Sequence, residues 1–137
     1  MKPSAGMTIF ALVGLGVMVL ACGCEKTKAD IGEDILTQMI ELQEDTMDDF
    51  FDIVEDQHDI CNKTVRDVRA LVDQREGQMQ TLLNQWEKLK ATSSTKDQRE
   101  AVNRVTPEVG KTFQRLEGQQ EAQYEIFEVF QSNCSEQ

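Results

Sequence analysis

Histidine, proline and positive charge are scarce in this chain of 137 residues. His58 is the one histidine, and no recognisable motif supplies the partners that a Ser-His-Asp arrangement or a multi-histidine metal centre would need. The 14 basic residues face 25 acidic ones, and the resulting formal charge of −11 argues against nucleic acid as a partner. Glycine-rich phosphate loops and Cys-x-x-Cys pairs are also missing. We therefore expect a protein that is not an enzyme and that holds no metal and no cofactor.

His58 does belong to one pair with metal-ligand spacing. Glu55 and His58 form a Glu-x-x-His motif, and ferritin-like helical bundles need two such pairs on different helices to hold a di-iron site. A second pair would need a second histidine, which the sequence lacks. The simpler interpretation is that His58 is a half-buried residue close to Cys61 on the apolar stripe of a helix.

The chain also lacks an apolar run long enough to cross a membrane comfortably. The longest run, Met7 to Leu20, follows Lys2 and precedes the small residue Ala21, which is the order of a secretion signal. The same segment is also compatible with an uncleaved anchor helix, or with an ordinary secretory signal in which the cysteine that follows has no role.

The tetrapeptide Val19-Leu20-Ala21-Cys22 resembles the lipobox of bacterial lipoproteins. The resemblance implies cleavage between Ala21 and Cys22 and attachment of a diacylglycerol to the Cys22 thiol, commonly with an amide-linked acyl chain such as palmitate. Several chains hold a protein firmly at a membrane where one chain would be marginal. Gly23 stands where an aspartate would favour the inner membrane, so the resemblance implies an anchor in the outer membrane, facing the periplasm. A second reading frame, ending at Cys24, fits less well.

Removal of residues 1–21 leaves a short polar tether, 22–29, and one helical domain, 30–137. In that domain Asp30 is the expected N-cap of a first helix, with Glu33 three residues later. Apolar residues recur every three or four positions from there, which predicts an amphipathic helix: they are Ile31, Ile35, Met39, Leu42, Met47, Phe50, Phe51 and Val54.

Two rows of residues seven apart follow, as in a coiled coil. One row is Val65, Val72, Met79 and Trp86, and the other is Cys61, Val68, Arg75, Leu82 and Leu89. The polar run Thr92 to Thr95 ends this second helix and can cap a helix that starts at Lys96.

Pro107 is better placed at the first position of a last helix, with Thr106 as its N-cap, than inside a continuous one. That helix carries apolar residues expected to face the core: Val109, Phe113, Leu116, Phe127 and Phe130. Methionines 39, 47 and 79 also lie at stripe positions and are expected in the core.

A turn at Asn62-Lys63 divides the chain into comparable rods and predicts an all-α, up-down-up bundle of three antiparallel helices. The last helix can be preceded by a short one. The alternative is a two-helix coiled-coil hairpin whose first helix runs from Ile31 to Lys90, since no glycine or proline lies between Glu33 and Glu76.

Cysteine pairing supports the three-helix arrangement. An exported protein meets oxidising conditions, and with Cys22 lipidated three thiols remain. Segments 63–91 and 106–134 each have 29 residues, which brings Cys61 and Cys134 to one end of the bundle. We therefore predict a Cys61–Cys134 disulfide. Two separate buried thiols are the alternative, and Cys24 is left over.

Negative charge is concentrated in the first helix, where twelve acidic residues and no lysine or arginine lie between Asp30 and Asp59. Several of these residues share one helical face: Glu41, Asp45, Asp48, Asp52, Glu55, Asp56 and Asp59. This face is a candidate docking surface for a cationic protein, or a low-affinity site for divalent cations. The structural interpretation is that basic residues of the second helix neutralise part of the charge: Lys63, Arg66, Arg69 and Arg75.

The sequence therefore predicts a lipid-anchored cell-envelope protein that acts as a non-catalytic binding or structural module, held at the membrane by its N-terminal lipid. The alternatives are a periplasmic holdase-type chaperone and a divalent-cation binder.

Overall fold

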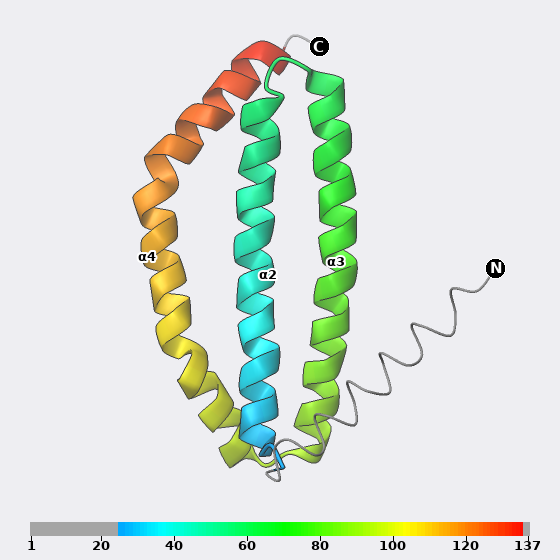
Figure 1. Ribbon diagram of the computed structural model, residues 1–137, viewed down its shortest axis with the longest axis vertical. Coiled ribbons are helices and arrows are strands. Elements are labelled where there is room, and N and C mark those ends of the chain that lie inside the picture. Colours follow the sequence, from blue (N-terminus) through cyan, green and yellow to red (C-terminus); the bar gives the residue numbers. More distant parts are fainter. Residues whose placement is uncertain (1–24, 136–137) are drawn as a thin grey trace, which may run out of the picture.

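Three long helices form the part of the chain that the computed structural model describes, residues 25–135. Helix α2 spans Lys28–Asp56, α3 spans Cys61–Thr92 and α4 spans Thr95–Cys134. They run up, down and up, as predicted, and residues 25–135 contain no strand (Figure 1). The predicted cleavage site Ala21/Cys22, the lipid on Cys22 and the leftover Cys24 lie outside the described residues.

Helix α2 begins earlier than expected, because Thr27 and not Asp30 is its N-cap. The Thr27 hydroxyl accepts the Asp30 N–H at 3.1 Å, and the Asp30 carboxylate accepts the Thr27 N–H at 3.0 Å. This reciprocal capping box satisfies two backbone donors that a helix start leaves without partners. Asp30 therefore acts as the N3 partner of the cap.

The first turn lies at residues 57–60, so the turn predicted at Asn62-Lys63 is wrong; both of those residues belong to α3. Thr64 determines the position of this turn. Its side chain is 1% exposed and its hydroxyl lies 2.6 Å from the Gln57 carbonyl and 3.1 Å from the Ile60 carbonyl. A buried hydroxyl needs such a partner, and here the partners belong to the turn itself. The break also rules out a single helix from Ile31 to Lys90.

The second turn lies where the polar run predicted it. Ser94 caps α4 by accepting the Asp97 N–H at 3.1 Å, and its hydroxyl donates to the Asp97 carboxylate at 2.8 Å. The Gln98 amide also donates to the Ser93 carbonyl at 3.2 Å, which ties the turn to the helix that follows.

Helix α4 is continuous through Pro107, so the helix start predicted at Thr106-Pro107 is wrong. A proline inside a helix lacks the N–H that would bond to the carbonyl four residues earlier, here that of Asn103. Pro107 and Asn103 are both exposed, so water can solvate that carbonyl and the helix continues.

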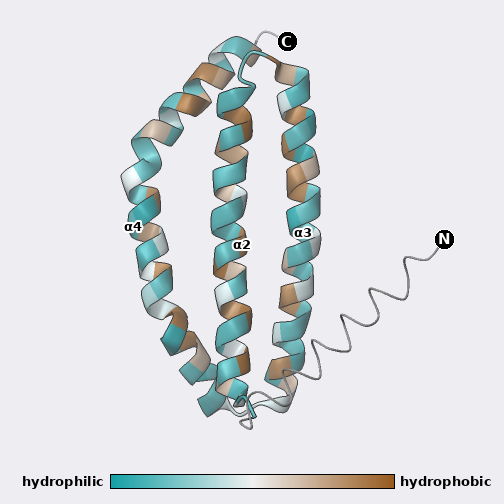
Figure 2. Ribbon diagram, in the orientation of Figure 1, coloured by the Kyte–Doolittle hydropathy of each residue, from teal (hydrophilic) through white to brown (hydrophobic). Residues whose placement is uncertain are grey.

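Helix α2 lies between the other two. It packs against α3 on one side and α4 on the other, while α3 and α4 have few contacts with each other (Figure 1). Each helix alternates hydrophobic and hydrophilic residues (Figure 2). The buried apolar side chains are few and lie along the two α2 contacts and at the ends of the bundle: Ala29, Ile35, Val54, Cys61, Leu71, Leu82, Leu89, Ala101 and Val105.

The three helices are tied together at both ends. At the lower end in Figure 1, a Cβ on Gly32 would lie 2.8 Å from the Cβ of Ala101 and 3.2 Å from side-chain atoms of Trp86 and Leu89. At the other end the predicted Cys61–Cys134 disulfide is present, with its Cα atoms 5.6 Å apart.

Candidate binding groove

The arch of α4 creates the main surface feature of the molecule. Helix α4 has 40 residues and α3 has 32, a difference of eight, which is about 12 Å of helix at 1.5 Å per residue. The Ser93-Ser94 turn holds one end of α4 and the disulfide holds the other, so the longer helix cannot lie straight beside its neighbours. It bows outward instead (Figure 1).

Contacts along α4 show where the extra length is taken up. The Arg115 guanidinium lies 3.0 Å from the Asp48 carboxylate, and the Asn133 side-chain amide donates to the His58 carbonyl at 3.4 Å. Between these contacts α4 advances 18 residues while the chain of α2 and its turn advances 10. The second half of α4 therefore carries most of the arch.

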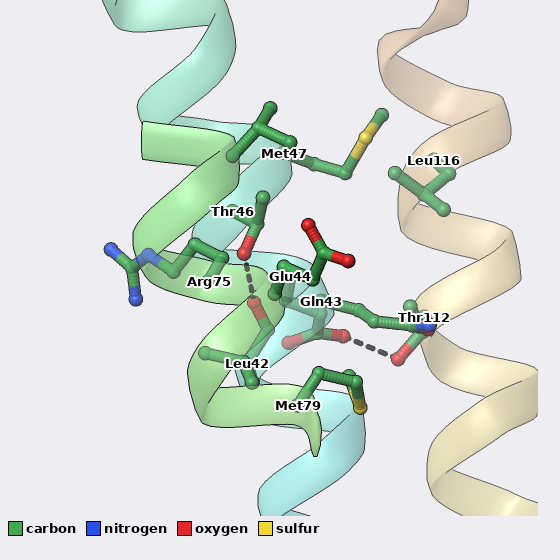
Figure 3. A pocket seen from close by; sticks show the side chains of 11 residues that line it. Leu42, Gln43, Glu44, Thr46, Met47, Arg75, Met79, Thr112 and Leu116 are labelled. Carbon is green, nitrogen blue, oxygen red and sulfur yellow. Dashed lines mark hydrogen bonds between the residues drawn. The ribbon is translucent and has the colours of Figure 1, made fainter. Parts of the chain in front are cut away.

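A cavity of about 520 Å³ opens where α4 bows away. Its floor comes from α2, and its walls come from α3 and α4. Met47 and Leu116 extend toward each other across the opening, while Arg75 points away from it (Figure 3). The lining includes Leu42, Thr46, Met47, Val72, Met79 and Leu116.

Two hydroxyl groups at this cavity are engaged by the protein itself. The Thr46 hydroxyl donates to the Leu42 carbonyl of its own helix at 2.5 Å, and the Thr112 hydroxyl of α4 donates to the Glu44 carboxylate of α2. The cavity therefore presents mainly methyl, methylene and thioether groups. Its volume is in the usual range for a small-molecule site.

A second apolar cavity, of about 310 Å³, continues the first toward the disulfide end. Val72 lines both cavities, so the two belong to one groove. Phe50 and Val54 form its floor, and Val65 from α3 and Phe127 from α4 form its walls. We call the two cavities together the α3–α4 groove.

Large apolar side chains on the walls of the groove remain exposed. Val65 is 47% exposed and Val72 is 48% exposed, and on α4 Phe127 is 38% exposed. Phe113 was predicted to face the core, and this is wrong: it is 63% exposed. It follows Thr112, which contacts Glu44 of α2, by one position and so points about 100° away from that contact. Met47 and Met79, also predicted in the core, line the open cavity instead.

Residues of both heptad rows of α3 line the groove. Val65, Val72 and Met79 come from one row, and Val68 and Arg75 come from the other. Three residues of the row that contains Val68 are buried, namely Cys61, Leu82 and Leu89. The seven-residue pattern therefore marks both the packed part of α3 and the part that faces the groove.

The predicted acidic docking face lies on the far side of α2 from the groove. Asp52 follows the groove residue Gln43 by nine positions, which is about two and a half turns at 3.6 residues per turn and so places it on the opposite side of the helix. Six of the seven predicted residues are exposed, namely Glu41, Asp45, Asp52, Glu55, Asp56 and Asp59. The seventh, Asp48, is half-buried and pairs with Arg115.

The neutralising residues differ from those predicted. Arg75 does reach α2, where it pairs with Asp49. Lys63 and Arg66, however, pair with Asp67 within α3. Arginines of α4 pair with four other carboxylates of α2: Arg104 contacts Asp30 and Glu33, and Arg115 contacts Glu44 and Asp48.

These ion pairs shift the titration of their members. The hydrogen bond from Arg104 lowers the pKa of the Asp30 carboxyl, and the backbone N–H and hydroxyl of Thr27 lower it further. The pKa of Arg115 is raised, chiefly by its hydrogen bond to Asp48. Both pairs join α4 to α2 and so help to hold the α4 wall in place.

His58 lies in the first turn and is half-buried. Its backbone carbonyl is the acceptor for the Asn133 amide described above. In the described part of the chain, no three histidine, cysteine, aspartate or glutamate side chains converge as a metal ion would require. Within residues 25–135, no helix combines the length and the apolar character needed to span a membrane.

Comparisons of this chain with protein families, with curated proteins and with solved structures find no match.

Proposed function

We propose that this protein is a lipid-anchored binding module of the bacterial cell envelope, which holds a segment of another protein in the α3–α4 groove. The observation that carries the proposal is the groove itself. Its walls expose Val65, Val72 and Phe127 to solvent, while both ends of the bundle are closed by packing and a disulfide. Exposed apolar residues gathered in one place mark interaction sites on soluble domains.

The N-terminal sequence supports the location. The signal-like segment ends at Cys22 in a lipobox-like tetrapeptide, so the mature chain would be held to the membrane by lipid. A disulfide between Cys61 and Cys134 fits the oxidising conditions outside the cytoplasm. The exposed acidic face of α2 is available to steer a positively charged partner toward the module.

Site-specific photocrosslinking in living cells tests this function. A benzophenone amino acid replaces Val72 in the groove, Asp52 on the acidic face, or Val129, which is 44% exposed and lies outside the residues that line the groove. We expect discrete adducts from position 72 and none from position 129. Adducts from position 52 alone would move the binding site to the acidic face.

The same experiment separates a dedicated partner from a chaperone. The exposed apolar groove also favours a holdase, which would bind many unfolded clients. A holdase gives a broad smear of adducts that grows after heat stress. A binding module gives one or a few bands that do not depend on stress. The absence of adducts at all three positions would overturn both functions.

A further inference from the structure

We propose that the occupant of the α3–α4 groove is a cationic amphipathic helix of about four turns, supplied by the partner protein. This inference rests on the proposed function and names the chemistry of the partner. It follows from the shape of the groove, the spacing of its apolar residues and the charge of its walls.

The shape is that of a bundle with one helix missing. In a four-helix bundle each helix packs against two neighbours. Here α2 has both neighbours, but α3 and α4 each pack mainly against α2 and have few contacts with each other. The position that would touch both of them, above Met47 and Phe50 of α2, is the groove.

The spacing on α3 matches a helical partner. Val65, Val72 and Met79 recur every seven residues along the wall, the repeat by which one helix packs its side chains against another. From Val65 to Met79 is 14 residues, which is about 21 Å, or about four turns of helix. An extended strand would instead need free backbone donors and acceptors on the walls, and helices use those groups internally.

The charge of the α4 wall determines the sign of the partner. Between Arg115 and Cys134, α4 carries Glu117, Glu121, Glu125 and Glu128 and no basic residue. Glu117 directly follows Leu116, which lines the larger cavity. Along α3 from Val65 to Met79 the charges balance, because Arg66, Arg69 and Arg75 accompany Asp67, Asp73 and Glu76. Glu76 lines the larger cavity and Arg69 the smaller one, while Arg75 points away from the larger (Figure 3). The excess of negative charge along the groove therefore comes from α4.

A second copy of this chain is a poorer occupant than a cationic helix. Removal of residues 1–21 takes away one basic residue and leaves 13 basic and 25 acidic residues, a formal charge of −12. Two copies would bring the same acidic α4 walls together, and like charges facing each other oppose docking. A basic helix meets the α4 wall with opposite charge and buries the exposed apolar residues at the same time.

The test uses the whole exported protein in phosphatidylcholine vesicles, with empty vesicles as the blank. The probe is a fluorescent peptide of 18 residues with leucines at heptad positions and lysines on the outer face. Two matched peptides accompany it: one with glutamates in place of the lysines, and one with the same composition in scrambled order. We expect the cationic amphipathic peptide to bind more than tenfold tighter than either.

Substitutions then locate the site. Val72→Gln with Leu116→Gln removes one apolar side chain from each wall without changing charge, and should weaken binding at least tenfold. Val72→Gln alone guards against misfolding of the pair, because Val72 is half exposed. Val129→Gln, at a position of similar exposure away from the groove, should leave binding unchanged.

Charge is tested with two matched double variants. Glu76→Gln and Glu117→Gln neutralise carboxylates at the groove, and should weaken binding and flatten its dependence on salt. Glu41→Gln and Asp45→Asn neutralise as many carboxylates on the opposite face of α2 and should have a much smaller effect. Equal effects of the two double variants would show a response to net charge alone and would overturn the inference.

Other results identify other occupants and also overturn it. Tight binding of the acidic peptide removes the charge argument, and binding of the scrambled peptide removes the helix argument. A dimer that dissociates in the Val72→Gln/Leu116→Gln variant assigns the groove to a second copy. A fatty acid found in the purified protein by mass spectrometry and lost in that variant assigns it to an acyl chain. If the peptides fail while photocrosslinks at position 72 persist, the binding function stands and only this partner class is wrong.

Discussion

Breaking the Cys61–Cys134 disulfide should lower the stability of the bundle while leaving its helices formed. The two cysteines are 73 positions apart in sequence. In the chain-entropy model, a cross-link that closes a loop of that length removes about 15 cal/mol/K from the unfolded state, or about 4.4 kcal/mol at 25 °C. Each helix keeps its own backbone hydrogen bonds after reduction, so helix content should change little.

The arch of α4 opposes part of this stabilisation. The bond holds a 40-residue helix against partners that are shorter, so reduction lets the end of α4 straighten and recovers some free energy. We therefore expect a net loss of about 2–4 kcal/mol in the free energy of unfolding, which lies inside the usual range for a native disulfide.

Equilibrium urea unfolding, followed by far-ultraviolet circular dichroism, measures this loss in protein kept oxidised or kept reduced. Reduction leaves every side chain in place, and a Cys61→Ala/Cys134→Ala variant should behave like the reduced protein. Cys24→Ser provides the control, because it removes a thiol but keeps the bond. A loss below about 1 kcal/mol, or a collapse of helix content on reduction, would refute the reasoning.

Three further predictions concern packing, pH and the anchor. Gly32→Ala should cost up to about 2 kcal/mol of stability despite the better helix propensity of alanine, because its Cβ would meet Ala101 at 2.8 Å. Gly77→Ala, with nothing within 4 Å of the new Cβ, should instead add about 1 kcal/mol. Similar effects of the two substitutions in urea unfolding would refute the close approach at Gly32. The lowered pKa of Asp30 means that its stabilising contribution is complete above the ordinary carboxyl pKa of about 3.9 and is lost as the pH falls further; the urea midpoint between pH 5 and pH 2 should fall less in Asp30→Asn, and identical pH profiles would contradict this. Cys22→Ser should abolish labelling with palmitate and release the protein from membranes, and continued labelling would rule out Cys22 as the lipidated residue.

Local sequence patterns determined the three helices. The three- and four-residue spacing of apolar side chains and the serines before Asp97 were enough to predict three helices and the second turn. The first turn was misplaced because its determinant is Thr64, whose hydroxyl bonds to carbonyls of the turn only once the residue is buried. A threonine in an amphipathic stretch gives no sign of that beforehand.

The predicted disulfide is present, but the reason given for it from the sequence was wrong. Equal lengths of 29 residues were expected because Pro107 was assigned to a helix start, whereas α4 continues through it and is eight residues longer than α3. An arch, and not a break, brings Cys134 to Cys61. Whether a proline ends a helix or lies on its exposed side depends on what packs around it, which is a long-range property.

The groove depends on that same long-range geometry. Periodicity shows that Val72, Met79 and Leu116 belong to apolar stripes, but a stripe that faces a core and one that faces an open groove have the same spacing. Only the closure of both ends of the bundle around a helix too long to lie straight places these side chains at a surface. The sequence by itself determined which residues are apolar and helical, and the tertiary structure decided which of them were left without a partner.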